Sequence, residues 1–329
     1  MSDEKKYFEE INILRGIAVL LVAIGHSFPD IHTGITRIGP RFIFYFIYCF
    51  HMAIFFIISG FLDNKVRRDT FSAYFKKKFE RLLIPYFSFS AISLLLKVFL
   101  NRYADNPFYF SDIWKIFLGD SPNWGLWFLW TLFVIEIINY LLNYYLKISE
   151  KTLLVFAFVA YLIQVFIGIP YLQLVLKYFV FYTLGAVIRT KYERITNEKR
   201  NNTGKIVTSL LILLVVTVAR TNSILDDQLY LLTGICGSYC SWILSIYIVK
   251  KKNAVCKFLN RSGKYSYDIY LIGYYPQMII RTILNRMFNA NYYITCILMF
   301  VGGFFIAAFI SIYIIRKNRF LSKVFLGIS

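Results

Sequence analysis

The chain is divided into apolar runs that are each long enough to cross a lipid bilayer. A helix of about 20 apolar residues spans the hydrocarbon core, and runs of about 17–22 residues recur along this sequence. Apolar residues make up 58% of the 329 residues, whereas a soluble domain has roughly half. The sequence therefore predicts an all-α integral membrane protein.

We expect about ten transmembrane helices, at residues 11–29, 42–62, 84–101, 124–146, 152–168, 171–189, 205–220, 228–249, 265–284 and 293–315. If the N-terminus is cytoplasmic, the inner segments hold 27 of the 37 Lys and Arg residues and the outer segments hold 7. Because cytoplasmic loops are enriched in these residues, both termini are predicted to be cytoplasmic. Topology thus accounts for the net charge of +19, which argues against nucleic acid as a partner.

The chain has no internal repeat, low-complexity tract or soluble stretch, so residues 1–329 are predicted to form a single membrane-embedded domain, multi-pass in a bacterial plasma membrane. The first ten residues are too polar for a signal peptide, and we expect the first span to be retained. Five scattered cysteines without metal-ligand spacing support neither disulfides nor a metal site. Residues 71–83 alternate apolar and basic positions, which is typical of an amphipathic helix on anionic membrane lipids.

The first span carries two polar residues that are expensive to bury in a membrane, Arg15 and His26. At about 1.5 Å per residue, His26 lies roughly 22 Å from the inner face and His51, on the next span, roughly 17 Å. A single intramembrane histidine is as often a packing residue, but two at matched depth favour a function. Asp30 follows His26 by four positions, on the same face if the helix continues, and is a candidate to orient the imidazole.

Arg15 keeps its charge at any working pH and needs an anionic partner or water. One interpretation is a structural ion pair with Glu136, roughly 12 Å from the inner face. The other is that Arg15 binds a phosphate-bearing ligand from the cytoplasm. The basic residues between positions 76 and 81 either set topology and contact lipid, or bind such phosphates.

The longest outer loop, at about 102–123, is rich in aromatic side chains. They form either an interfacial aromatic belt or a platform for sugar rings: Tyr103, Phe108, Tyr109, Phe110, Trp114 and Trp124.

Five segments resemble, in order, the membrane-bound acyltransferase 3 family, and most closely its fucose 4-O-acetylase-like branch. They are LRGIAVLLVAIGHS (14–27), FHMAIFFIISGFL (50–62), FERLLIPYF (79–87), LWFLWTLFVIEI (126–137) and SYDIYLIGYYP (266–276). The spacing of Arg15 and His26 followed by the second segment is the most specific part. The resemblance implies acyl transfer, usually of acetyl, from cytoplasmic acyl-CoA to a carbohydrate hydroxyl.

The resemblance also implies residue roles. His26 would be the essential histidine and Arg15 its paired arginine, while Arg81 and Lys78 would help to bind CoA. Lys78 stands where the family often has arginine, and Gly273 stands where many members have histidine. No extracellular hydrolase domain follows the membrane part, so we expect any second catalytic step to need another protein.

The favoured function is therefore an acetyl-CoA-dependent O-acetyltransferase that modifies a surface polysaccharide or its lipid-linked precursor and holds no permanent cofactor. His26 would be the general base, with Arg15 and Asp30 in the catalytic centre. Candidate substrate-binding residues are His51, Ser59, Glu136 and Trp124. Two alternatives are a transporter or flippase of lipid-linked sugar, and a scaffold subunit of a polysaccharide synthase.

Overall fold

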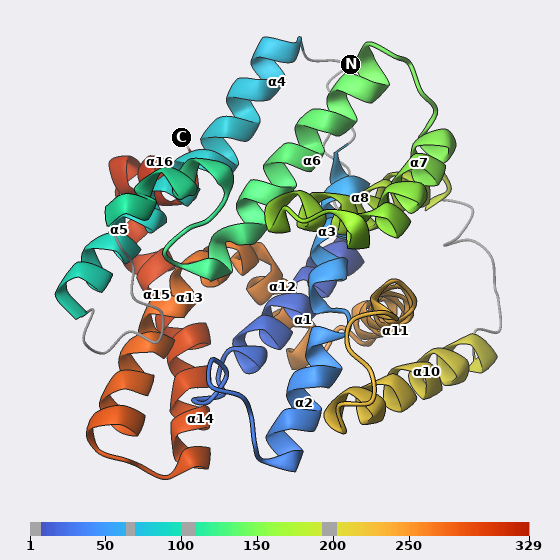
Figure 1. Ribbon diagram of the computed structural model, residues 1–329. Helices are drawn as coiled ribbons and strands as arrows, with labels where there is room; N and C mark the ends of the chain where they lie inside the picture. The colour runs from blue at the N-terminus through green and yellow to red at the C-terminus, as the bar shows by residue number, and fades with distance from the viewer. Residues whose placement is uncertain (1–7, 64–69, 101–109, 193–202, 329) are drawn as a thin grey trace. The chain divides into compact units, whose positions relative to one another are not determined.

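The structure is a computed structural model that describes residues 8–63, 70–100, 110–192 and 203–328. Within these residues the secondary structure consists of helices joined by turns, with no β-strand (Figure 1). The all-α class expected from the apolar runs is therefore confirmed for the described part of the chain.

The chain folds into two compact parts, each built from separate stretches of sequence. The first part comprises residues 1–55 and 198–308, and the second comprises 56–197 and 309–329. The chain passes between them within α3 (His51–Leu62) and α15 (Ala307–Ile310).

The first part contains α1, which carries Arg15, and the helices that pack around it. Apart from residues of α3 and α15, its helices are α1 (Glu9–Gly25), α2 (Ile38–Tyr48), α10 (Thr203–Thr221), α11 (Tyr230–Lys251), α12 (Ala254–Lys264), α13 (Ser266–Ile280), η6 (Arg281–Met287), α14 (Tyr292–Val301) and η7 (Gly302–Ile306). The helix α1 packs against α2, α11, α12 and α13, so it is the central helix of this part (Figure 1).

Two glycines bring α1 and α12 into backbone contact. A Cβ on Gly16 would lie 2.2 Å from the carbonyl oxygen of Leu259, and a Cβ on Gly263 would lie 1.8 Å from the carbonyl oxygen of Asn12. The Asn12 side chain also donates a 2.7 Å hydrogen bond to the carbonyl of Asn260. Small residues allow helices to approach closely, and polar side chains join them where water is absent.

The expected span at 42–62 is broken at residues 49–50, between α2 and α3. The Cys49 carbonyl is left without a helical partner and accepts a 3.0 Å hydrogen bond from the hydroxyl of Thr233 on α11. The Phe50 ring packs where Gly237 has no side chain, because a Cβ there would lie 2.1 Å from it. The neighbouring helix α11 thus provides a hydrogen-bond donor to the backbone at the break. In an apolar environment, backbone polar groups at a break need such a partner.

The second part contains the remaining helices. They are α4 (Phe71–Lys78), η1 (Phe79–Leu83), α5 (Ile84–Leu100), η3 (Phe110–Leu118), η4 (Trp124–Leu126), α6 (Trp127–Tyr144), α7 (Glu150–Ile163), η5 (Gln164–Phe166), α8 (Pro170–Thr190), η8 (Ser311–Ile315) and α16 (Arg319–Leu326). Here α8 packs against α6 and α7, and α5 packs against α16.

The amphipathic helix expected at 71–83 is not a separate element. Residues 71–98 form one helical stretch that is long and apolar enough to cross a membrane, with a π-helical turn at η1. Pro85 explains the turn, because it has no N–H to donate to the carbonyl of Arg81, four residues earlier. Lys76 and Lys77 remain exposed on this stretch.

Seven helical stretches in the described residues are long and apolar enough to span a membrane. They are Ile38–Leu62, Phe71–Val98, Trp124–Tyr144, Pro170–Thr190, Thr203–Thr221, Tyr230–Lys251 and Tyr292–Ile315. The other three expected spans correspond to shorter α-helices, because α1, α7 and α13 have 17, 14 and 15 residues. The total of about ten spans and the cytoplasmic termini stay predictions.

Candidate active site

Arg15 and His26 lie on one face of α1. They are eleven positions apart, which is about three turns, so their side chains leave the helix in nearly the same direction, about 16 Å apart along its axis. Both side chains are half-buried. His26 is the residue at which the helix ends, because Gly25 is its last residue and His26 has φ −92° and ψ 1°.

One tyrosine ring contacts both His26 and His51. The Tyr48 ring centroid lies 6.1 Å from that of His26, edge-on, and 4.7 Å from that of His51. Gly25 makes room for this ring, because a Cβ there would lie 3.1 Å from its Cε2. The two histidines thus flank one aromatic ring, and their equal depth in a membrane stays a prediction.

His51 is buried at the start of α3, and its tautomer follows from one contact. Its Nδ1 lies 2.9 Å from the carbonyl oxygen of Ile47. A carbonyl only accepts hydrogen bonds, so Nδ1 carries the proton and Nε2 of the neutral ring is left as an acceptor.

Asp30 does not share a helical face with His26. The prediction that their four-residue spacing places them on one face of a helix is therefore wrong. The helix ends at Gly25, and Asp30 lies in the turn that follows. Its Oδ1 accepts a 2.8 Å hydrogen bond from the hydroxyl of Tyr292, whose ring stacks 4.4 Å from the guanidinium of Arg37. This contact links the turn after α1 to the first residue of α14.

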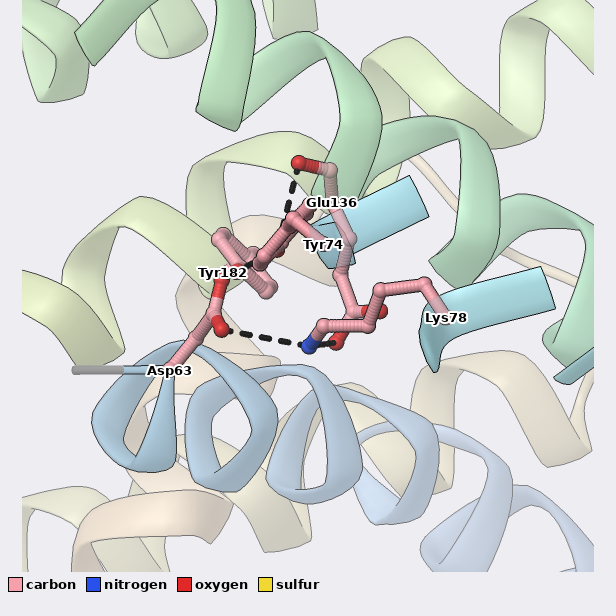
Figure 2. A network of polar contacts seen from close by, with 5 residues as sticks. All are labelled: Asp63, Tyr74, Lys78, Glu136 and Tyr182. Atoms are coloured by element: carbon pink, nitrogen blue, oxygen red, sulfur yellow. Dashed lines mark hydrogen bonds and ion pairs between the residues drawn. The ribbon is translucent and has the colours of Figure 1, made fainter. Parts of the chain in front are cut away.

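Lys78 and Glu136 belong to a buried network in the second part of the chain (Figure 2). The Lys78 ammonium lies 2.7 Å from Oε1 of Glu136 and 3.1 Å from Oδ1 of Asp63. Oδ2 of Asp63 accepts hydrogen bonds from the hydroxyls of Tyr74 and Tyr182. Oε2 of Glu136 is buried and has no hydrogen-bond partner.

The network changes the interpretation of both residues. Lys78 is surrounded by two carboxylates, and this arrangement does not favour the phosphate contact expected of it. Glu136 forms an ion pair with Lys78. From the sequence, an ion pair between Glu136 and Arg15 was one of two interpretations. Asp63, Tyr74 and Tyr182 belong to no sequence motif, so no pattern in the sequence indicates their place in this network.

Arg81 lies on the π-helical turn η1 and meets the end of α16. Its Nη1 donates a 3.1 Å hydrogen bond to the carbonyl of Leu326, the last residue of that helix. The C-terminal end of a helix carries partial negative charge, which a guanidinium stabilises. This contact gives Arg81 a structural role, and its contribution to CoA binding stays a prediction.

Three other expected features lie in the second part or outside the described residues. Ser59 is half-buried on α3, and Trp124 is 65% exposed at the start of η4. Both lie in the second part of the chain. Of the aromatic loop, Trp114 is exposed on η3, whereas Tyr103, Phe108 and Tyr109 lie outside the described residues.

Residues 8–316 match the acyltransferase 3 family, which is defined by an acyltransferase domain. The chain belongs to the acyltransferase 3 family. The match includes residues of both compact parts. An acyltransferase 3 domain transfers an acyl group to a carbohydrate at a membrane, so this chain is an acyltransferase of that kind. No curated protein and no solved structure matches the chain.

The structure explains one departure from the family's sequence. Gly273, where the sequence resemblance implies a histidine in many members, lies at a close crossing of α13 and η7. A Cβ there would lie 2.6 Å from the carbonyl oxygen of Gly303. A histidine cannot occupy this site unless the two helices separate.

Proposed function

We propose that the protein transfers an acetyl group from cytoplasmic acetyl-CoA to a hydroxyl of a bacterial surface polysaccharide or its lipid-linked precursor. Membership of the acyltransferase 3 family supports acyl transfer to carbohydrate. The order of the five sequence segments supports the fucose 4-O-acetylase-like branch. The observation that carries the proposal is the position of His26 at the end of α1, on the same face as Arg15.

His26 is the general base of this reaction. A sugar hydroxyl is a weak nucleophile, and a neutral imidazole takes its proton as the oxygen attacks the thioester carbonyl. The tetrahedral intermediate then collapses with loss of the CoA thiolate, and the imidazolium returns the proton to that sulfur. The helix end supports this role, because the partial negative charge of its last carbonyls favours the transient imidazolium.

Arg15 binds the donor. Its guanidinium presents a planar set of donors that matches a phosphate or a developing oxyanion. It lies about 16 Å closer to the N-terminal end of α1 than His26, which is the cytoplasmic end if the N-terminus is cytoplasmic. The phosphates of CoA would meet Arg15, while the acetyl-bearing arm extends towards His26.

The acceptor approaches the histidines from the outer side. Nε2 of His51 is left as a hydrogen-bond acceptor, which suits a sugar hydroxyl. Asp30 acts by fixing the turn after His26 through Tyr292. At the inner side, exposed Lys76 and Lys77 would contact anionic lipid.

The test follows the two halves of the donor separately. Purified protein in vesicles is given acetyl-CoA with one label on the acetyl group and another on the CoA, together with glycan-bearing membranes from a strain that lacks the gene. The proposal predicts that the acetyl label enters the glycan while the CoA label is released as free thiol. Movement of glycan across the vesicle without loss of thioester would support a flippase and contradict the proposal.

A further inference from the structure

In the last turn of α1, just before His26, the carbonyl of Ala23 does not receive the hydrogen bond that the N–H of Ser27 would give it in a continuing helix. That N–H donates instead to the carbonyl of Ile24 at 3.0 Å. A side chain from another helix takes its place: Nε2 of Gln277 on α13 donates a 2.9 Å hydrogen bond to the carbonyl of Ala23. The Gln277 side chain is buried, at 5% exposure.

Gln277 reaches α1 because two glycines keep its path open. A Cβ on Gly303 would lie 2.5 Å from the Cδ and Nε2 atoms of Gln277. Gly273, one turn earlier on the same face of α13, lets that helix lie against the Gly303 backbone. Gly273 is therefore part of the packing that places Gln277 against α1.

We propose that Gln277 is a positioning residue, which fixes the last turn of α1 and thereby the imidazole of His26. Ala23 is three residues from His26, on the turn from which the histidine projects. A general base acts only within hydrogen-bond reach of its proton, and a displacement of about 1 Å can lower the rate about 100-fold. This inference rests on the proposed role of His26.

A buried glutamine between helices also stabilises packing, by about 0.6–2 kcal/mol in membrane proteins. A loss of activity alone would not separate the two roles. A positioning role predicts a change in kcat without a change in donor affinity, and it predicts dependence on His26.

The first variant is Gln277→Met, which keeps the length and removes the donor. We expect kcat for labelled acetyl transfer to fall about 10- to 100-fold, with KM for acetyl-CoA within about twofold of the wild type. In a His26→Ala background the same substitution should leave the residual rate unchanged, because residues that act as a unit are not additive.

The second test keeps Gln277 in the sequence and displaces its side chain. Gly303→Ala places a methyl group against the Gln277 side chain, whereas Gly302→Ala places one 2.4 Å from the mobile Cδ1 tip of Ile280. We expect Gly303→Ala to reproduce the fall in kcat and the matched Gly302→Ala to stay within about twofold of the wild type. This pair keeps the proposal testable if Gln277→Met fails to fold.

Three results would overturn the proposal. One is a kcat near wild type in both Gln277→Met and Gly303→Ala while His26→Ala is inactive, which would leave the proposed function intact. Another is an equal loss from Gln277→Met in the presence and absence of His26, which would make its role purely structural. The third is full activity of His26→Ala, which would overturn the base assignment and the positioning role together.

Discussion

In the network of Figure 2, Lys78 supplies the one positive charge among five residues, between the carboxylates of Asp63 and Glu136. Its side chain is 16% exposed, and the two carboxylates are 5% and 6% exposed. Removal of the partner of a buried charge typically costs about 3–5 kcal/mol, because the remaining charge is left uncompensated. The network therefore links the end of α3 to α4, α6 and α8 through buried polar contacts.

We expect Lys78→Met to lower the free energy of unfolding by about 3–5 kcal/mol, measured by thermal unfolding in detergent. The matched control is Lys77→Met, one position earlier on the exposed side of α4, which should change it by less than about 0.5 kcal/mol. Equal stability of the two variants, with a raised KM for acetyl-CoA only in Lys78→Met, would instead make Lys78 a donor-binding residue.

Arg15→Lys keeps the positive charge and removes the planar set of donors. If Arg15 binds the donor, KM for acetyl-CoA should rise about tenfold, which corresponds to about 1.4 kcal/mol of lost binding energy. Arg319→Lys, at an exposed position on α16, should leave KM unchanged. An unchanged KM together with a lower melting temperature for Arg15→Lys would assign Arg15 to a structural contact.

At the scale of helices, the crossing of α13 and η7 leaves no space for a side chain. Gly273→Ala should lower the free energy of unfolding by about 1–3 kcal/mol, because its Cβ meets the backbone of Gly303. Gly204→Ala is the control, on α10, where a Cβ meets nothing within 4 Å. Thermal unfolding of both variants checks this, and a neutral Gly273→Ala would contradict the close crossing.

Apolar run length and composition predict the helical class and most of the spans, because those properties are local. They do not predict where helices end. The pairing of Asp30 with His26 on one helical face requires that α1 continue past Gly25, but Pro29 disfavours helical backbone at Phe28 and marks an end that run length alone does not show. The break at residues 49–50 depends on Thr233 and Gly237, which are far away in sequence.

Some features of the candidate site can likewise be predicted from the sequence, and others cannot. The sequence predicts that His26 and His51 lie at one depth, because depth follows from counting residues along two spans. It does not predict Tyr48 between them, the network around Lys78 or the contact of Gln277 with Ala23. Each of these depends on which helices become neighbours, and side-chain periodicity does not encode that.

At the scale of the whole molecule, the asymmetry of basic residues makes a prediction about topology. A cysteine introduced by Lys77→Cys, at an exposed position that this asymmetry assigns to the inner side, should be labelled only after the cells are opened. A cysteine introduced by Thr33→Cys, in the exposed turn after α1, should react with an impermeant reagent in intact cells. The opposite pattern would invert the orientation and place Arg15 on the outer side.

The most direct test of the account is acetyl transfer by three histidine variants that insert normally. His26→Ala, His51→Ala and His32→Ala are compared for the initial rate at which labelled acetyl enters the glycan. We expect a loss of about 10²–10⁴-fold for His26→Ala, a smaller loss for His51→Ala and no change for His32→Ala, which lies exposed in the turn after α1. A correctly inserted His26→Ala protein with a rate near that of the wild type would contradict the account.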